Sequence, residues 1–98
     1  MEQIKVRVLH QVWVYQKDIV DIFGYKSPSG LLKKFRDFCD THPSFFSPHK
    51  PYMLHDKSLI QYDVYCFAFY FENRGLLDAG SRSIKFQDDV DRLKEVYG

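Results

Sequence analysis

The sequence of 98 residues lacks several features that mark common classes of small protein. It has two cysteines, Cys39 and Cys66, each in an apolar helical pattern. This predicts buried thiols, with a disulfide as the lesser alternative. No apolar run of about 18 residues is present, so no membrane span is expected. Residues 1–9 lack the apolar block and cleavage site of a signal peptide, which favours a cytoplasmic protein.

Catalytic and metal-binding motifs are also missing. The chain contains no P-loop, no Gly-x-Gly-x-x-Gly, no Gly-x-Ser-x-Gly and no His-Glu-x-x-His. Cys39 and His42 have a metal-like spacing, but no second pair of ligands matches them. His49 and His55 are interpreted as surface loop residues, with a weak metal site in the turn as the alternative. The sequence therefore predicts no enzyme, no metal and no cofactor.

Apolar and aromatic side chains are abundant, at 45% and 17% of the sequence, enough for one domain over residues 1–98. The net charge is +1, but residues 1–50 hold eight basic and five acidic residues, and residues 51–98 hold six and eight. A stretch without any acid contains Lys26, Lys33, Lys34 and Arg36. Such a local basic patch suits docking to nucleic acid. A solvated helix face is the alternative.

These basic residues lie in a segment, residues 15–39, that has the pattern of two short helices joined by a tight turn. The first helix has one apolar side and ends at Gly24, since glycine tolerates the positive φ found after a helix. Ser27 is predicted to cap the second helix, and Pro28 to occupy its first position. The second helix is expected to end near residues 40–42, because Pro43 disfavours helix before it.

The second helix is predicted to be amphipathic. Its apolar stripe consists of Leu31, Leu32, Phe35, Phe38 and Cys39. Its opposite face carries Ser29, Gly30, Lys33 and Asp37, with Lys34 and Arg36 at the flanks. Small and basic residues in its first turns suit a helix that enters the major groove of DNA. An ordinary pair of packed helices is the alternative.

Extended segments are predicted on both sides of the helical pair. Residues 3–9 alternate as in a half-buried strand, and Trp13 is expected to anchor the core in the extended segment that follows. Residues 43–60 hold three of the four prolines and predict a β-hairpin, or wing. Its tip is either Ser47–Lys50 or His55–Ser58. In both cases side chains near the tip would reach DNA phosphates: Lys50, Tyr52 and Lys57.

Two more helices are expected. Asp63 is a candidate N-cap for an aromatic helix over residues 62–77, for which length and a polar end favour helix over buried strand. This helix either forms the centre of the core or leaves an exposed apolar strip for a partner. Residues 76–83 are predicted to form a loop, and residues 86–97 an amphipathic helix with an acidic start that disfavours DNA contact.

The segment from residue 15 to residue 38, with the aromatic and proline-containing hairpin after it, resembles the winged helix-turn-helix of phage excisionases and related MerR-like proteins. The resemblance covers residues 12–60. It implies an α+β fold that is mostly helical with a short β-hairpin wing. It also implies a DNA-binding protein of a mobile element, which recognises repeated sites and bends DNA or regulates promoters. The recognition-helix contacts it implies are Ser29, Lys33, Lys34 and Arg36.

We therefore expect sequence-specific binding of double-stranded DNA without catalysis, in a bacterial or phage-infected cell. The expected contacts are Lys26, Ser27, Ser29, Lys33, Lys34, Arg36, Lys50, Tyr52 and Lys57. A nearly neutral chain should bind weakly alone, so we expect a homo-oligomer or cooperative loading on adjacent sites. The alternative from another class is a protein-interaction module, such as a phage-encoded adaptor or inhibitor, that uses an exposed aromatic surface.

Overall fold

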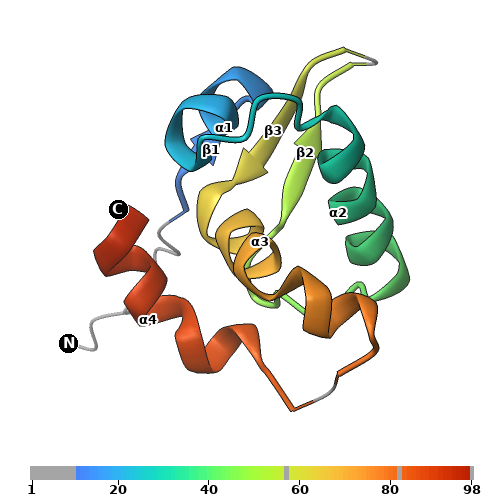
Figure 1. Ribbon diagram of the computed structural model, residues 1–98, viewed down its shortest axis with the longest axis vertical. Coiled ribbons are helices and arrows are strands. Elements are labelled where there is room, and N and C mark those ends of the chain that lie inside the picture. Colours follow the sequence, from blue (N-terminus) through green and yellow to red (C-terminus); the bar gives the residue numbers. More distant parts are fainter. Residues whose placement is uncertain (1–10, 57, 82, 98) are drawn as a thin grey trace, which may run out of the picture.

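The computed structural model describes residues 11–56, 58–81 and 83–97, and within them the chain has an α+β fold (Figure 1). The elements in chain order are β1 (Trp13–Val14), α1 (Gln16–Phe23), α2 (Ser29–Thr41), β2 (Tyr52–Leu54), β3 (Ile60–Asp63), α3 (Val64–Asp78) and α4 (Phe86–Tyr97). The three strands form an antiparallel sheet in the order β1-β3-β2. The predicted strand over residues 3–9 lies outside the described residues.

β3 is the central strand of the sheet and forms a hairpin with β2. The hairpin predicted over residues 43–60 is confirmed only in its second half, because residues 43–49 form turns and a bend and the hairpin continues to Asp63. Tyr62 of β3 lies opposite Val14 of β1 on one side and Tyr52 of β2 on the other. The turn follows Leu54, so the tip is the His55–Ser58 alternative and not Ser47–Lys50. Asp56 closes this turn, because its carboxylate accepts hydrogen bonds from the backbone N–H groups of Ser58 and Leu59 at 2.7 and 2.9 Å. These bonds hold the pKa of Asp56 below its usual value.

The turn between α1 and α2 follows the prediction at its first end only. Gly24 has a φ of 66°, and its N–H donates to the carbonyl of Val20, as expected for a glycine that ends a helix. At the other end, the prediction that Ser27 caps α2 is wrong. Pro28 is the cap residue, with φ −81° and ψ −3°, and no side chain caps the helix. Because the Pro28 carbonyl already accepts the N–H of Leu32 at 2.7 Å, Ser27 lies one residue too early to cap.

The aromatic helix α3 forms the centre of the core, as predicted. Every residue from Val64 to Tyr70 is at most 2% exposed. Phe35 of α2 packs against Phe67 and Tyr70 with ring centroids 5.5 and 5.4 Å apart, and Phe23 of α1 lies 5.1 Å from Phe67. Figure 1 shows α3 between the other helices and beside the sheet. Over these residues α3 therefore does not leave the exposed apolar strip that was the alternative.

Three other expectations about the core and its edges need correction. Trp13 is half-buried and is not a core residue, since its neighbour Val14, at 8% exposed, faces the core instead. The loop predicted from Leu76 begins later, because α3 continues to Asp78. His49 is not a surface residue, since it is only 6% exposed. The two cysteines are free and buried, as predicted.

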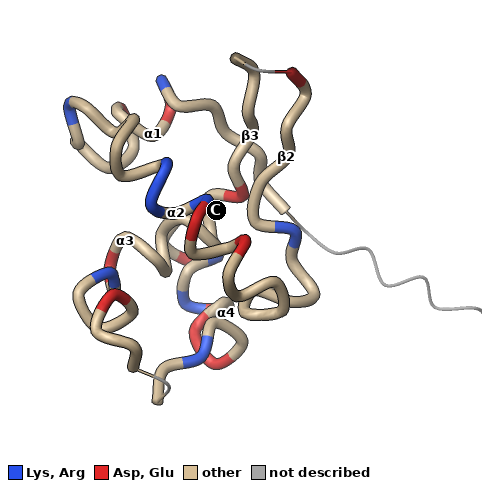
Figure 2. Tube along the Cα trace, turned by 90° about the vertical axis from the view of Figure 1, so that its right-hand side faces the viewer, with Lys and Arg blue, Asp and Glu red and all other residues tan. Residues whose placement is uncertain are grey.

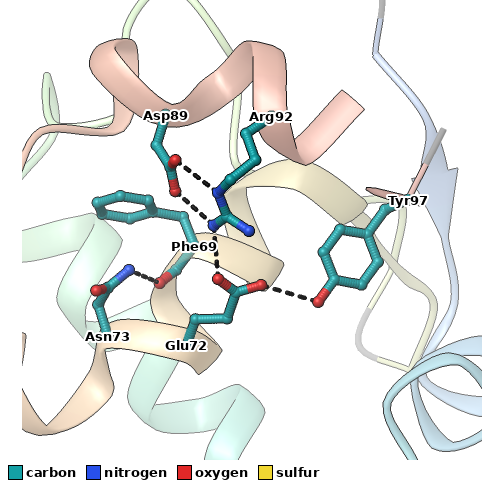
Figure 3. Close-up of polar contacts among 6 residues, drawn as sticks. All are labelled: Phe69, Glu72, Asn73, Asp89, Arg92 and Tyr97. Atoms are coloured by element: carbon teal, nitrogen blue, oxygen red, sulfur yellow. Dashed lines mark hydrogen bonds and ion pairs between the residues drawn. The ribbon is translucent and has the colours of Figure 1, made fainter. Parts of the chain in front are cut away.

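The amphipathic helix α4 has the predicted bounds and is fastened to α3 by a polar network (Figure 3). Arg92 donates to Asp89 on its own helix at 2.7 Å and to Glu72 of α3 at 2.6 Å. The hydroxyl of Tyr97 donates to the other oxygen of Glu72 at 2.9 Å. The Arg92 guanidinium holds the pKa of Asp89 below its usual value. Under this network, Leu93 is fully buried against the core.

Asp63 is the N-cap of α3, as predicted, and it also joins segments distant in sequence. Its Oδ1 accepts the backbone N–H groups of Tyr65 and Cys66 at 2.8 and 3.2 Å. Its Oδ2 contacts Nδ1 of His49 at 3.0 Å and the side-chain amide of Gln11. The carboxylate is fully buried. Asp63 therefore ties the N-terminal segment and the segment before β2 to the junction of β3 and α3.

We expect Asp63→Ala to destabilise the fold by about 3 kcal/mol or more, because it removes a helix cap and leaves buried donors without their acceptor. Urea denaturation at pH 7 measures this loss. Asp56→Ala is the matched control, because Asp56 also accepts backbone N–H groups but is exposed in the hairpin turn. An equal loss of stability in the two variants would contradict the role assigned to Asp63.

We also expect the fold to lose stability at alkaline pH. Burial raises the pKa of Cys39, Tyr52 and Tyr70 to about 12, and it raises the pKa of Tyr62 and Cys66 as well. Because the folded chain holds these protons more tightly, the unfolded chain loses them first as pH rises. Stability is then fully present below pH 9.0, the ordinary thiol value, and falls toward pH 12. A urea midpoint that stays constant from pH 8 to pH 11 would contradict this.

Candidate nucleic-acid interface

The opening turns of α2 lie at the surface, as a recognition helix requires. Ser29 and Gly30 are exposed, and the side chain of Lys33 is 71% exposed. Lys33 forms an ion pair with Asp37 one turn further along, at 3.1 Å, and Asp37 is 63% exposed. An exposed pair of this kind contributes little stability and exchanges readily with water. Lys33 is therefore free to leave Asp37 for another anion.

The start of α2 is also suited to anions by its backbone. The first four N–H groups of a helix have no partner within the helix, and its N-terminus carries a partial positive charge. In α2 no side chain caps these groups, and the first turn contains no acidic residue. An oxygen of a phosphate that approaches this end would meet N–H donors and no negative charge.

A groove of about 620 Å³ runs between the first turn of α1, the outer side of α2 and the hairpin. We call it the α2–hairpin groove, and its walls include Lys17, Ser29, Arg36, Ser58, Leu59 and Tyr62. In Figure 2 several of the blue segments of basic residues lie at α1 and α2, others lie elsewhere on the chain, and the end of the hairpin carries a red segment. The groove thus joins the recognition-helix candidate to the wing candidate, with positive charge on the helical side.

Two predicted contacts are held by bonds within the protein. Arg36 is half-buried, and its Nη1 donates to the hydroxyl of Tyr62 at 2.6 Å, which places its guanidinium in the wall of the groove. The hydroxyl of Tyr52 donates to Asp40 at 2.6 Å. The expectation that Tyr52 presents a free donor to phosphates is therefore wrong. The side chain of Lys50 is exposed, while Lys57 lies outside the described residues.

The other predicted contacts lie on the opposite side of α2. Ser27 and Lys34 line a second hollow, of about 490 Å³, together with Arg74 of α3. Lys26 is exposed in the turn before α2. The predicted contact residues therefore lie on different sides of α2. Ser29 and Arg36 face the hairpin, Ser27 and Lys34 face α3, and Lys33 is on the outer surface.

Lys17 lines the α2–hairpin groove and Arg74 lines the second hollow, and the contacts predicted from sequence included neither of them. Lys17 is on the polar face of α1, and only the turn between α1 and α2 brings it to the α2–hairpin groove. Arg74 is near the end of α3 and stacks its guanidinium over Phe71, 4.5 Å from the ring centroid. No local pattern predicts either position, because both depend on how distant helices pack.

Comparison of the chain with protein-family models, with curated proteins and with solved structures gives no match. The resemblance to winged helix-turn-helix proteins therefore stays a prediction from sequence. Among the residues that the structure describes, no helix combines the length and the apolar character needed to cross a bilayer.

We expect the bond between Arg36 and Tyr62 to stabilise the hairpin against α2 by about 1 kcal/mol. A double-mutant cycle with Arg36→Ala and Tyr62→Phe, read by urea denaturation, isolates this energy. The coupling should be favourable and should weaken little with salt, because Tyr62 is neutral. A coupling near zero would mean that Arg36 is free in solution, in which case it counts with Lys33 as an available cation.

Proposed function

We propose that this protein binds double-stranded DNA without catalysis, with α2 in the major groove and the β2–β3 hairpin as a wing on the backbone. The observation that carries the proposal is the exposed opening of α2, with Lys33 71% exposed, beside a hairpin that shares a groove with it. The order α1, α2, hairpin agrees with a winged-helix arrangement. The proposal places the protein in the cytoplasm of a bacterial or phage-infected cell.

The residue types on the outer side of α2 suit this role. The major groove is about 12 Å wide and admits one helix, whose N-terminal residues meet the base edges. Ser29 and Gly30 are small and exposed, so they allow the backbone to approach the bases closely. Lys33 is long enough to donate to the acceptors of guanine. We assign base contact to these residues and phosphate contact to Lys17, Lys26 and Lys34.

The charge of the protein sets how strongly it binds. With the three phosphate contacts assigned above, the logarithm of affinity should fall with the logarithm of salt concentration at a slope of about −3. Asp37 on α2 and Asp56 at the hairpin turn reduce the attraction. We therefore propose that the protein acts as a homo-oligomer or loads cooperatively on adjacent sites.

A protein-interaction module was the alternative, and it rested on exposed aromatic side chains. The rings of α3 up to Tyr70 are buried, which leaves that alternative without the surface it needs on this helix. An interaction surface of this kind would have to use exposed aromatic side chains outside this part of α3, such as Tyr15 and Tyr25.

The test is a pair of double variants with equal loss of charge. Lys33→Ala with Lys34→Ala should lower affinity for duplex DNA roughly tenfold at low salt, because two phosphate or base contacts are lost. Its melting temperature should stay unchanged, since both side chains are exposed. Lys85→Ala with Lys94→Ala, at the two ends of the acidic helix α4, is the control and should leave affinity almost unchanged. Fluorescence anisotropy with random duplexes measures both.

Selection of the bound sequences then tests specificity, and an enriched motif is the expected result. Equal weakening in the two double variants would show attraction to the overall charge and would remove α2 from the interface. No retention of the unaltered protein on any duplex at low salt would overturn the proposal.

A further inference from the structure

One cluster among the described residues has the atoms of a metal site, and it lies away from the α2–hairpin groove. Nδ1 of His49, a carboxylate oxygen of Asp63 and Sγ of Cys66 all lie within 4.8 Å of one another. All three residues are buried, at 6%, 0% and 0% exposed. We propose that His49, Asp63 and Cys66 bind a single divalent zinc ion.

The fold brings the three side chains together from two segments. Asp63 is the N-cap of α3, and Cys66 follows three residues later, in the first helical turn, so both side chains lie on the same side. His49 comes from the segment before β2, and its Nδ1 lies 3.0 Å from Oδ2 of Asp63. The spacing of Asp63 and Cys66 is therefore local, whereas His49 is placed by tertiary structure.

The donor set suits zinc and does not suit the alkaline-earth ions. Zinc binds imidazole nitrogen, carboxylate oxygen and thiolate sulfur in tetrahedral sites, with bonds of about 2.0–2.3 Å. Two donors on one such ion are then about 3.3–3.8 Å apart. The His49–Asp63 separation of 3.0 Å is a few tenths of an ångström below that range, and Sγ of Cys66, within 4.8 Å of both atoms, would move toward the ion on binding. Magnesium and calcium prefer all-oxygen sites, and a buried thiol does not serve them.

Charge balance also fits a dry site. The ion carries two positive charges, the Asp63 carboxylate one negative charge, and the Cys66 thiolate a second, so the occupied cluster is neutral. On binding, the Cys66 thiol releases its proton to solvent, and His49 coordinates through Nδ1 with its proton on Nε2. The hydrogen bond between His49 and Asp63 is replaced by two bonds to the metal. A neutral site avoids the large cost of a buried net charge.

The surroundings offer a fourth ligand and an apolar wall. The side-chain amide of half-buried Gln11 already contacts Oδ2 of Asp63, and a half-turn of that amide would place its oxygen beside the same carboxylate as a fourth donor. A water molecule would fill the same position. The ring of His49 packs edge-on against Phe86 with centroids 5.2 Å apart, which holds its orientation. Zinc would thus pin Gln11 and the segment before β2 to the start of α3.

The experiment is a cobalt titration of the full chain, without a histidine tag and under reducing conditions. We expect one equivalent of Co²⁺ to bind with a thiolate-to-cobalt absorption band in the near ultraviolet, and zinc to displace it. Cys66→Ser should abolish the band and weaken zinc binding by at least about 100-fold, the upper end of what loss of an outer-shell partner costs. Cys39→Ser is the matched control, since Cys39 is the other buried free cysteine, and should keep the band.

X-ray absorption of the zinc-loaded, unaltered protein identifies the donor atoms directly, so this readout does not depend on whether a variant folds. One sulfur donor with nitrogen or oxygen donors is expected. A coordination shell without sulfur overturns the proposal, as does a cobalt titration without a thiolate band or a band that persists in Cys66→Ser. In each of those cases His49, Asp63 and Cys66 form a hydrogen-bonded network only.

Discussion

The fully buried carboxylate of Asp63 is the interaction on which the rest of the structure depends. A buried charge is costly unless donors surround it, and here two backbone N–H groups of α3 and the side chains of Gln11 and His49 do so. The same residue ends the central strand and begins the central helix. This allows α3 to leave the sheet directly into the core, without a connecting loop.

The direction of α3 determines how the outer elements are arranged. Because its aromatic side chains project on all sides, helices α1, α2 and α4 each find a ring to pack against, as Phe23, Phe35 and Phe86 do. This packing buries the apolar stripe of α2, so the polar face of α2 lies at the surface. The exposure of Ser29 and Lys33 is thus a consequence of core packing and does not depend on any ligand.

The proposed interface combines a rigid part with a free part. Arg36 is bonded to Tyr62 and Tyr52 to Asp40, so these side chains hold the hairpin against α2. Lys33, Lys26 and Lys17 are exposed, and Lys33 is paired only with the exposed Asp37. Fixed geometry near the helix and exposed cations around it suit the proposed surface, which would position a helix in a groove. The acidic start of α4 belongs to a separate contact with α3, through Arg92.

Local pattern alone determined the elements themselves. The helical spacing of the stripe on α2 and of α4, the glycine after α1 and the aspartate before α3 are signals carried by residues close in sequence, and the structure confirms them. Tertiary structure decided the burial of His49, the half-exposure of Trp13 and the bonds of Arg36 and Tyr52. Each of these depends on a partner or a packing surface that the fold supplies. No periodicity within a short window encodes such a neighbour, so only the folded chain could assign it.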